Sequence, residues 1–530
     1  MRPIRTLLIC VLLYMSTFTS CSGEYTAQET RTPLPFGTSE ALASALDEAH
    51  IRRENLIRPN TDTFVPLTQG RDFTYNPRRL SPRLVMADEV PRSAARADIR
   101  MLFSTLNRYY GAYIYLGGDD VFLPIRDSLM DIVDTQAVWD TNCLAVLIHE
   151  ALSSVINDRH MHLNRIGFTG INYGFFSYSG RFAIETEGFK CQATGRYVAE
   201  LILPCNPDYI LEIADIFRLS MDEGGEYFFY TPILALRLQA EQLAPCYLLI
   251  MYKCGTTETV ALEAYAMPMF AQLGSLAYHV SYEPHEIIPF EPFTSLELIQ
   301  GFPVVSVNKM GTPDAPDGEN ASGVAMQFLE YARVLRDEPI IIIDLRGNVG
   351  GNGILPTQWL YYLLDEIVPH NFVKLTPMDY YAYREFTGID AMLPTEVEVS
   401  IFSTISPLDD NHTISGFPTG SLVENNQLII LLIDRLVGSA GEAMVDLAFS
   451  IENTFVIGQN THGALICVGD ARRTMPGSGI PFGFGVSLFV HPEGHFTESR
   501  GFAPDIWVSG DALEAAIGML SNHLSHLPSG

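Results

Sequence analysis

The C-terminal half of the chain alternates short, unbroken apolar runs with segments whose apolar residues recur at helical spacing. Unbroken apolar runs predict strands that are buried on both faces, whereas apolar residues three and four apart predict helices. Strands are predicted at residues 302–307, 339–345, 428–433, 454–457 and 484–490, and helices at residues 321–335, 354–368 and 440–451. This alternation predicts an α/β fold with a largely parallel sheet.

The N-terminal half shows different patterns. Helical periodicity predicts one helix over residues 94–110 and a second that starts near Leu144 and ends in residues 157–162 (NDRHMH). Residues 166–285 are predicted to hold strands. We expect five parts: residues 1–21 as a signal peptide, 22–94 as an irregular tether, 95–165 as a helical domain, 166–285 as a strand region, and 286–525 as the α/β core.

The first residues have the pattern of a secretory signal. Two arginines precede an apolar run over residues 7–14, which is too short to span a membrane as a mature helix. Residues 18–21 (FTSC) resemble a bacterial lipoprotein box with the lipid on Cys21, although Phe18 departs from the usual aliphatic residue. The alternative is ordinary cleavage after Ser22. The sequence therefore predicts an exported protein, a periplasmic or cell-envelope lipoprotein that contacts the membrane only through its lipid.

Length and charge narrow the possible functions. A chain of 530 residues is too long for one core, so about two or three domains are expected. The formal net charge of −29 argues against nucleic-acid binding, which needs a basic face. The cysteines after Cys21 match no known disulfide framework and include no paired CxxC, so neither a thiolate zinc site nor another cofactor is expected.

The first candidate for chemistry is residues 438–442 (GSAGE), which lie between a predicted buried strand and a predicted helix. A strand, a sharp turn and a helix lift a serine hydroxyl off the end of a sheet, and the helix N-terminus favours developing negative charge. Ser439 is thus a candidate nucleophile. Ser439 and Glu442 also fit a capping box, in which the serine only satisfies amides at the helix start.

A second candidate is the glycine-rich segment 344–353 (DLRGNVGGNG), which also follows a buried strand and precedes a helix. Glycines let backbone amides approach a ligand closely. The segment fits neither the dinucleotide fingerprint nor a phosphate loop with its lysine. It could supply an oxyanion-hole amide beside a nucleophile, or it could be a plain turn with Asp344 and Arg346 as an ion pair.

Four segments together resemble a known family. They are residues 158–160 (DRH), 344–351 (DLRGNVGG), 438–442 (GSAGE) and 498–505 (ESRGFAPD). In this order they resemble the motifs of the tricorn and C-terminal-processing serine peptidases, over about residues 95–510 of this chain. The resemblance implies a crotonase-like α/β core. It also implies a degenerate PDZ-like module near residues 196–265.

The resemblance also implies roles for residues around the serine. Ser439 matches the nucleophile, and Gly350 or Gly351 would hold the oxyanion together with the amide of Ala440. The tricorn peptidase has an aspartate directly after its serine that favours basic side chains. Ala440 stands at that position here, so the resemblance implies no preference for basic residues.

The general base differs between the branches of the family. The bacterial processing branch uses a lysine, whose place is taken here by Ala464. The tricorn-like branch uses a histidine that matches His160 and an acidic partner that matches Glu498. A histidine that takes the hydroxyl proton while a carboxylate orients it is a coherent arrangement. His462 lies in a neighbouring block and is a rival base.

We therefore expect an exported serine endopeptidase that cleaves proteins or peptide tails through an acyl-enzyme. A non-catalytic protein that binds peptides or other ligands on the same fold is the alternative, because fold does not settle function. A metallohydrolase built on His160 and His162 is a more distant alternative, since no further ligand cluster accompanies them in the sequence.

Overall fold

The computed structural model describes residues 31–56, 85–169, 172–203, 209–210, 217–225, 228–238, 246–264, 294–310, 320–377, 406–409, 412–415 and 422–525. The predicted signal peptide and Cys21 lie outside these residues. Among the residues described, no helix has the length and apolarity needed to cross a membrane.

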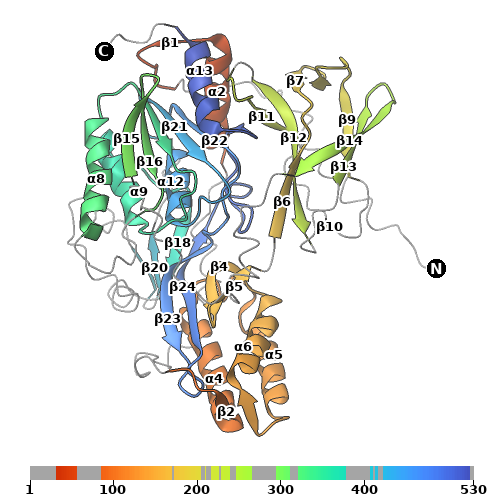
Figure 1. Cartoon of the computed structure of the whole chain (residues 1–530), viewed down its shortest axis with the longest axis vertical. Helices are drawn as coiled ribbons and strands as arrows, with labels where there is room; N and C mark the ends of the chain where they lie inside the picture. The colour runs from red at the N-terminus through yellow and green to blue at the C-terminus, as the bar shows by residue number, and fades with distance from the viewer. Residues whose placement is uncertain are drawn as a thin grey trace, which may run out of the picture.

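A mostly parallel sheet forms the α/β core (Figure 1). Its strands, in spatial order, are β15 (Thr294–Ile299), β16 (Phe302–Val307), β17 (Ile340–Asp344), β21 (Leu428–Ile433), β22 (Thr454–Gly458) and β25 (Ile506–Trp507). The strands from β16 to β25 pair in parallel, and the edge strand β15 is antiparallel. The predicted α/β fold is thus confirmed.

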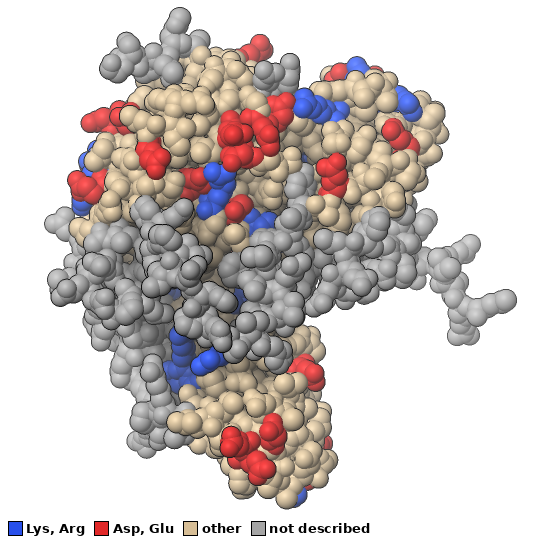
Figure 2. All heavy atoms as spheres, in the orientation of Figure 1, with Lys and Arg blue, Asp and Glu red and all other residues tan. Residues whose placement is uncertain are grey.

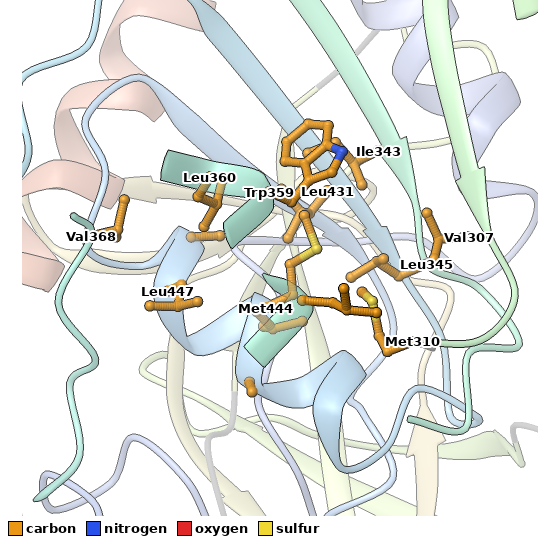
Figure 3. Packing of buried hydrophobic residues seen from close by; sticks show 14 of the residues in the cluster. Val307, Met310, Ile343, Leu345, Trp359, Leu360, Val368, Leu431, Met444 and Leu447 are labelled. Carbon is orange, nitrogen blue, oxygen red and sulfur yellow. The ribbon is translucent and has the colours of Figure 1, made fainter. Parts of the chain in front are cut away.

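Helices cover both faces of this sheet, as the unbroken apolar runs require. The helices α8 (Asn320–Val334), α9 (Ile354–Leu364) and α12 (Ala440–Ala448) cover one face, and α2 (Glu40–Glu54) and α13 (Ala512–His523) cover the other. Figure 3 shows Trp359 of α9 and Met444 of α12 packed with Ile343 and Leu431 of the sheet. Alternate residues of each strand therefore enter two separate apolar layers.

Helix α2 lies within residues 22–94, which the sequence predicted to be an irregular tether; that prediction is wrong for residues 40–54. The Ser39 side chain caps the helix by accepting from the Leu42 amide. Arg53 pairs with Asp505 of the core, and both side chains are 4% exposed. Its buried residues Leu42, Ala45, Leu46 and Ala49 lie at helical spacing and pack on the core sheet, so the sequence contains a helical pattern that the prediction overlooked.

The helical domain contains α4 (Arg92–Tyr109), α5 (Gly118–Val133) and α6 (Thr141–Ser153). These helices pack against β23 (Cys467–Thr474) and β24 (Pro481–Val490), which run from the core to this domain (Figure 1). The second predicted helix ends at Ser153, earlier than expected. Residues 157–163 instead form β4 (Asn157–Leu163), which pairs with β5 (Ile166–Thr169) and with β24. Because β24 lies far along the chain, no local pattern announces this strand.

The strand region is continuous with the core sheet. It contains β6 (Asn172–Ser177), β7 (Phe182–Glu185), β8 (Gly188–Cys191), β9 (Val198–Ile202), β10 (Tyr209–Ile210), β11 (Phe217–Ser220), β12 (Phe229–Leu238), β13 (Cys246–Tyr252) and β14 (Thr257–Ala264). Strand β11 pairs in parallel with β25 at Ser220 and Trp507. The remaining short strands are β1 (Gly37–Thr38), β2 (Glu89–Pro91), β3 (Val138–Asp140), β18 (Val373–Thr376), β19 (Ser406–Asp409), β20 (His412–Ser415) and β26 (Leu524–Ser525). On the face in Figure 2, acidic side chains gather on both the core and the helical domain, in keeping with the net charge.

Candidate active site

Ser439 occupies a sharp turn between β21 and α12. Its backbone has φ 51° and ψ −116°, a conformation that residues with a side chain rarely adopt. Such strain persists only where the surroundings impose it, and it is concentrated at functional sites. The predicted capping box is present as well, and the Ser439 amide donates to Glu442 Oε2 at 3.1 Å. The turn therefore caps the helix and also presents the hydroxyl at the end of the sheet.

His160 faces this hydroxyl. The distance between His160 Nε2 and Ser439 Oγ is 3.0 Å, although the two residues are 279 positions apart in the sequence. This distance is within the range for proton transfer between a nucleophile and its base. The structure thus brings together the serine and the histidine that the sequence singled out.

A β-bulge in β4 positions His160. Asp158 lies opposite Phe168, and His162 lies opposite Gly167, the neighbouring residue on β5. The three residues from 159 to 161 therefore have no opposing residue on β5. A bulge interrupts the ladder and redirects side chains, and here it carries the histidine that meets Ser439.

Two buried carboxyl groups accept the amides of this bulge. Asp158 Oδ1 accepts from the His160 amide at 2.9 Å, and Glu498 Oε1 accepts from the Arg159 amide at 3.0 Å. The other Glu498 oxygen accepts from the amides of Leu465 and Ile466. Glu498, which the sequence proposed as the partner of His160, therefore lies at the site and holds the main chain next to the histidine.

Burial changes the acidity of both groups. It raises the pKa of Asp158 to about 7, against the hydrogen bonds it accepts. Burial and the neighbouring Asp158 raise the pKa of Glu498 to about 8. The two carboxyls therefore repel each other when both are charged, and near neutral pH they retain protons that exposed carboxyls would have lost.

The glycine-rich loop after β17 touches the serine turn. A Cβ atom added to Gly350 would lie 2.6 Å from Ser439 Cβ and 3.0 Å from Ala440 N. The Gly350 amide donates to Asn348 Oδ1 at 2.8 Å, so that amide is already engaged. Of the two glycines considered for the oxyanion hole, Gly350 therefore packs against the serine turn, and its amide is bonded to Asn348.

Gly351 pairs with Met310 in an isolated parallel bridge. Met310 donates to the Gly350 carbonyl, and its own carbonyl accepts from Asn352. Gly351 lies between the two residues that bond to Met310. In a parallel pair, the amide of a residue in that position points away from the partner strand. The Gly351 amide is thus turned away from Met310, and φ 140° at this position favours glycine.

Comparison with known proteins relates the core of this chain to a family. Residues 305–508 match the model of peptidase family S41. The matched region contains Ser439, the glycine-rich loop and Glu498. The chain is a serine-type peptidase. No curated protein matches the chain.

Several solved structures resemble this chain. Mature CPAF complexed with lactacystin is 15% identical with a TM-score of 0.39, covering 81% of this chain and 98% of that one. The photosystem II D1 C-terminal processing protease is 10% identical with a TM-score of 0.34, covering 78% and 92%. The tricorn protease is 12% identical with a TM-score of 0.28, covering 78% and 34%.

The rival base His462 has another partner in this structure. Its Nε2 lies 2.9 Å from Nη1 of Arg159, which is always a donor. Burial, Arg159 and Arg435 lower the pKa of His462 to about 3. An imidazole that already accepts from a guanidinium cannot also take a proton from Ser439. Ala464, at the place of the lysine in the other branch, is buried and donates its amide to Glu442.

Glu442 is a contributor whose importance the sequence did not reveal. Its side chain is fully buried, and one oxygen accepts from Ser439 and Ala464 while the other accepts from Thr461 Oγ1 and the Gly463 amide. Burial raises its pKa. The capping-box pattern predicted the contact of Glu442 with the Ser439 amide. Only the fold brings the donors of residues 461–464 to the same carboxyl group.

The metal alternative gains no support from the geometry. Within the described part of the chain, no group of three or more His, Cys, Asp or Glu side chains is arranged to hold a metal ion. His162 lies opposite Gly483 of β24, packed against that strand. The described cysteines are free thiols: Cys143, Cys191, Cys246, Cys254 and Cys467.

Proposed function

We propose that this chain is an exported serine endopeptidase that cleaves proteins or unstructured peptide tails through an acyl-enzyme. The single observation that carries the proposal is the 3.0 Å distance between His160 Nε2 and the hydroxyl of Ser439, which lies in a strained turn at the end of a parallel sheet. A capping serine requires neither the strain nor the histidine.

In the proposed reaction, Ser439 Oγ attacks the scissile carbonyl while His160 Nε2 accepts the hydroxyl proton. The carbonyl oxygen becomes an oxyanion, held by the amides of Ala440 and Gly351 and favoured by the N-terminus of α12. His160 then gives the proton to the leaving amine, and water repeats the sequence to release the acyl group. Glu498 orients His160 through the main chain, because it accepts the amide of the neighbouring Arg159.

The finer features of the fold are also proposals. A crotonase-like arrangement of the core accords with the α/β layers around β17 and β21. A PDZ-like role for residues 196–265 would let the strand region hold an extended peptide tail at a strand edge. Export and lipid attachment at Cys21 rest on the sequence pattern alone. Detergent partitioning and intact mass test them, and a water-soluble mature form that starts at Gly23 would rule out the lipid.

Labelling with a fluorophosphonate probe tests the function directly. The parent protein should be labelled, and Ser439→Ala should lose all labelling and reduce peptide cleavage by orders of magnitude. Ser439→Ala also removes a helix cap, which costs about 0.5–2 kcal/mol of stability. The matched control is Ser39→Ala, which removes the cap of α2 and should label like the parent. An unlabelled, correctly folded parent would refute the acyl-enzyme.

A further inference from the structure

We propose that Asp158 is a positioning residue for the general base, because its buried carboxyl group fixes the bulge that aims His160 at Ser439. This role is additional to the Ser-His-Glu arrangement and rests on the proposed function. Asp158 does not act on the substrate; it acts through the main chain of the residue that takes the proton.

The bulge leaves backbone amides that need acceptors from outside the ladder. Because residues 159–161 have no opposing residue on β5, their amides lose the acceptors that a regular ladder supplies. A buried amide without an acceptor is costly, so such a bulge persists only where other groups accept its amides.

Asp158 accepts the amide of the catalytic histidine itself. Its Oδ1 lies 2.9 Å from the His160 amide nitrogen. The Asp158 side chain is 0% exposed, so water does not compete for this bond. Glu498 accepts the preceding amide, that of Arg159. The two carboxyls thus hold two consecutive amides of the bulge, one of which belongs to the histidine.

The charge state of the pair is suited to this role. Burial raises the pKa values of Asp158 and Glu498 to about 7 and about 8, so the pair holds less than two full negative charges near neutral pH. Arg159 and Glu442 interact electrostatically with Glu498, and the buried Tyr110 hydroxyl interacts with both carboxyls. A partly protonated pair still accepts amides through its oxygens, and it can balance the charge that His160 gains during the reaction.

Asp158→Ala removes the acceptor of the His160 amide and should let the bulge relax. A displacement of about 1 Å in a catalytic group can cost about 10²-fold in rate. We therefore expect the maximal rate of fluorophosphonate labelling, kinact, to fall by about that factor, with the half-saturating concentration, KI, unchanged. Asp158→Asn keeps one acceptor oxygen and the same shape, so it should recover most of the lost rate.

The matched control is Asp98, a buried aspartate of α4 that likewise accepts backbone amides, here those of Gly477 and Ser478. Asp98→Ala should destabilise the helical domain while kinact per folded molecule stays at the parental value. Rates are normalised to the folded fraction from urea unfolding. If Asp158→Ala does not fold, Asp158→Leu, which fills the space without an acceptor, decides, with the same loss of kinact at unchanged KI expected.

Parental kinact in a folded Asp158→Ala, or in Asp158→Leu when the alanine variant does not fold, would overturn the inference and leave the peptidase intact. An equal loss of kinact in Asp98→Ala would overturn it too, because the effect would then be general destabilisation. Failure of the parent itself to label would refute the proposed function and this inference with it.

Discussion

The two halves of the catalytic pair are built in opposite ways. Ser439 is positioned by its own stretch of chain: β21 ends at Ile433, the turn follows, and α12 begins at Ala440. His160 is positioned by a bulge whose amides are accepted in part by Glu498, 339 residues away from Arg159. A local element determines the nucleophile, and a tertiary assembly determines the base.

This difference has a mechanical consequence. The nucleophile is fixed by buried strand and helix residues and by Glu442, which is bonded at both oxygens. The base depends on a few hydrogen bonds to buried carboxyls. We therefore expect substitutions near Ser439 to act by direct clash, and substitutions near His160 to act by loss of orientation.

The largest effect is expected from the histidine itself. His160→Ala should lower the rate of peptide cleavage by about 10²–10⁴-fold, the usual contribution of a general base. His462→Ala should cost far less, because that imidazole accepts from Arg159. Steady-state kcat on the same peptide, with folding checked by circular dichroism, measures both. The reverse order of the two losses would mean that the base is His462.

The next effect tests the nucleophile side. Gly350→Ala would place a methyl group 2.6 Å from Ser439 Cβ at φ 103°, so the turn must shift. A shift of this kind should lower kinact with the fluorophosphonate by about 10²-fold. Gly353→Ala is the control in the same loop, since a Cβ atom there meets nothing within 4 Å. Equal labelling of the two variants would show that the turn tolerates the contact.

The smallest effect concerns pH and the base side. The pKa values of Asp158 and Glu498 are raised to about 7 and about 8 from the ordinary values of 3.8 and 4.5. Between these limits the native protein binds more protons than the unfolded chain, so its free energy of unfolding falls as pH rises. The pKa of His462 is lowered from its ordinary value of 6.5 to about 3. Between these values the unfolded chain binds the additional proton, so this histidine makes the free energy of unfolding rise with pH.

Comparing the pH dependence of unfolding in the parent and in carboxyl variants separates the effect of Asp158 and Glu498 from that of His462. From about pH 5 to about pH 8, the free energy of unfolding should fall more with rising pH in the parent than in Asp158→Asn, because the variant lacks one titrating group. Glu498→Gln should flatten the curve in the same direction. Urea unfolding at several pH values measures this, and parallel curves for parent and variants would contradict the raised pKa values.

The sequence by itself determined what is local. The apolar runs of β17 and β21 predict buried parallel strands because each must cover two faces. The turn at Ser439 and the glycines of the neighbouring loop follow from the short segments that contain them. The sequence singled out His160 through a resemblance of motifs, yet it predicted that His160 ends a helix.

Only the tertiary structure decided how the site is assembled. The residues from Asp158 to His160 form a bulged strand because β24 and β5 pair with the ends of β4 and buried carboxyls accept the amides between them. Helix α2 has an apolar helical spacing in the sequence, but its place on the core sheet and the pairing of Arg53 with Asp505 were decided by the fold. The contacts of β4 with β24 and of Arg159 with Glu498 join segments hundreds of residues apart, and such contacts leave no periodic signal in the sequence.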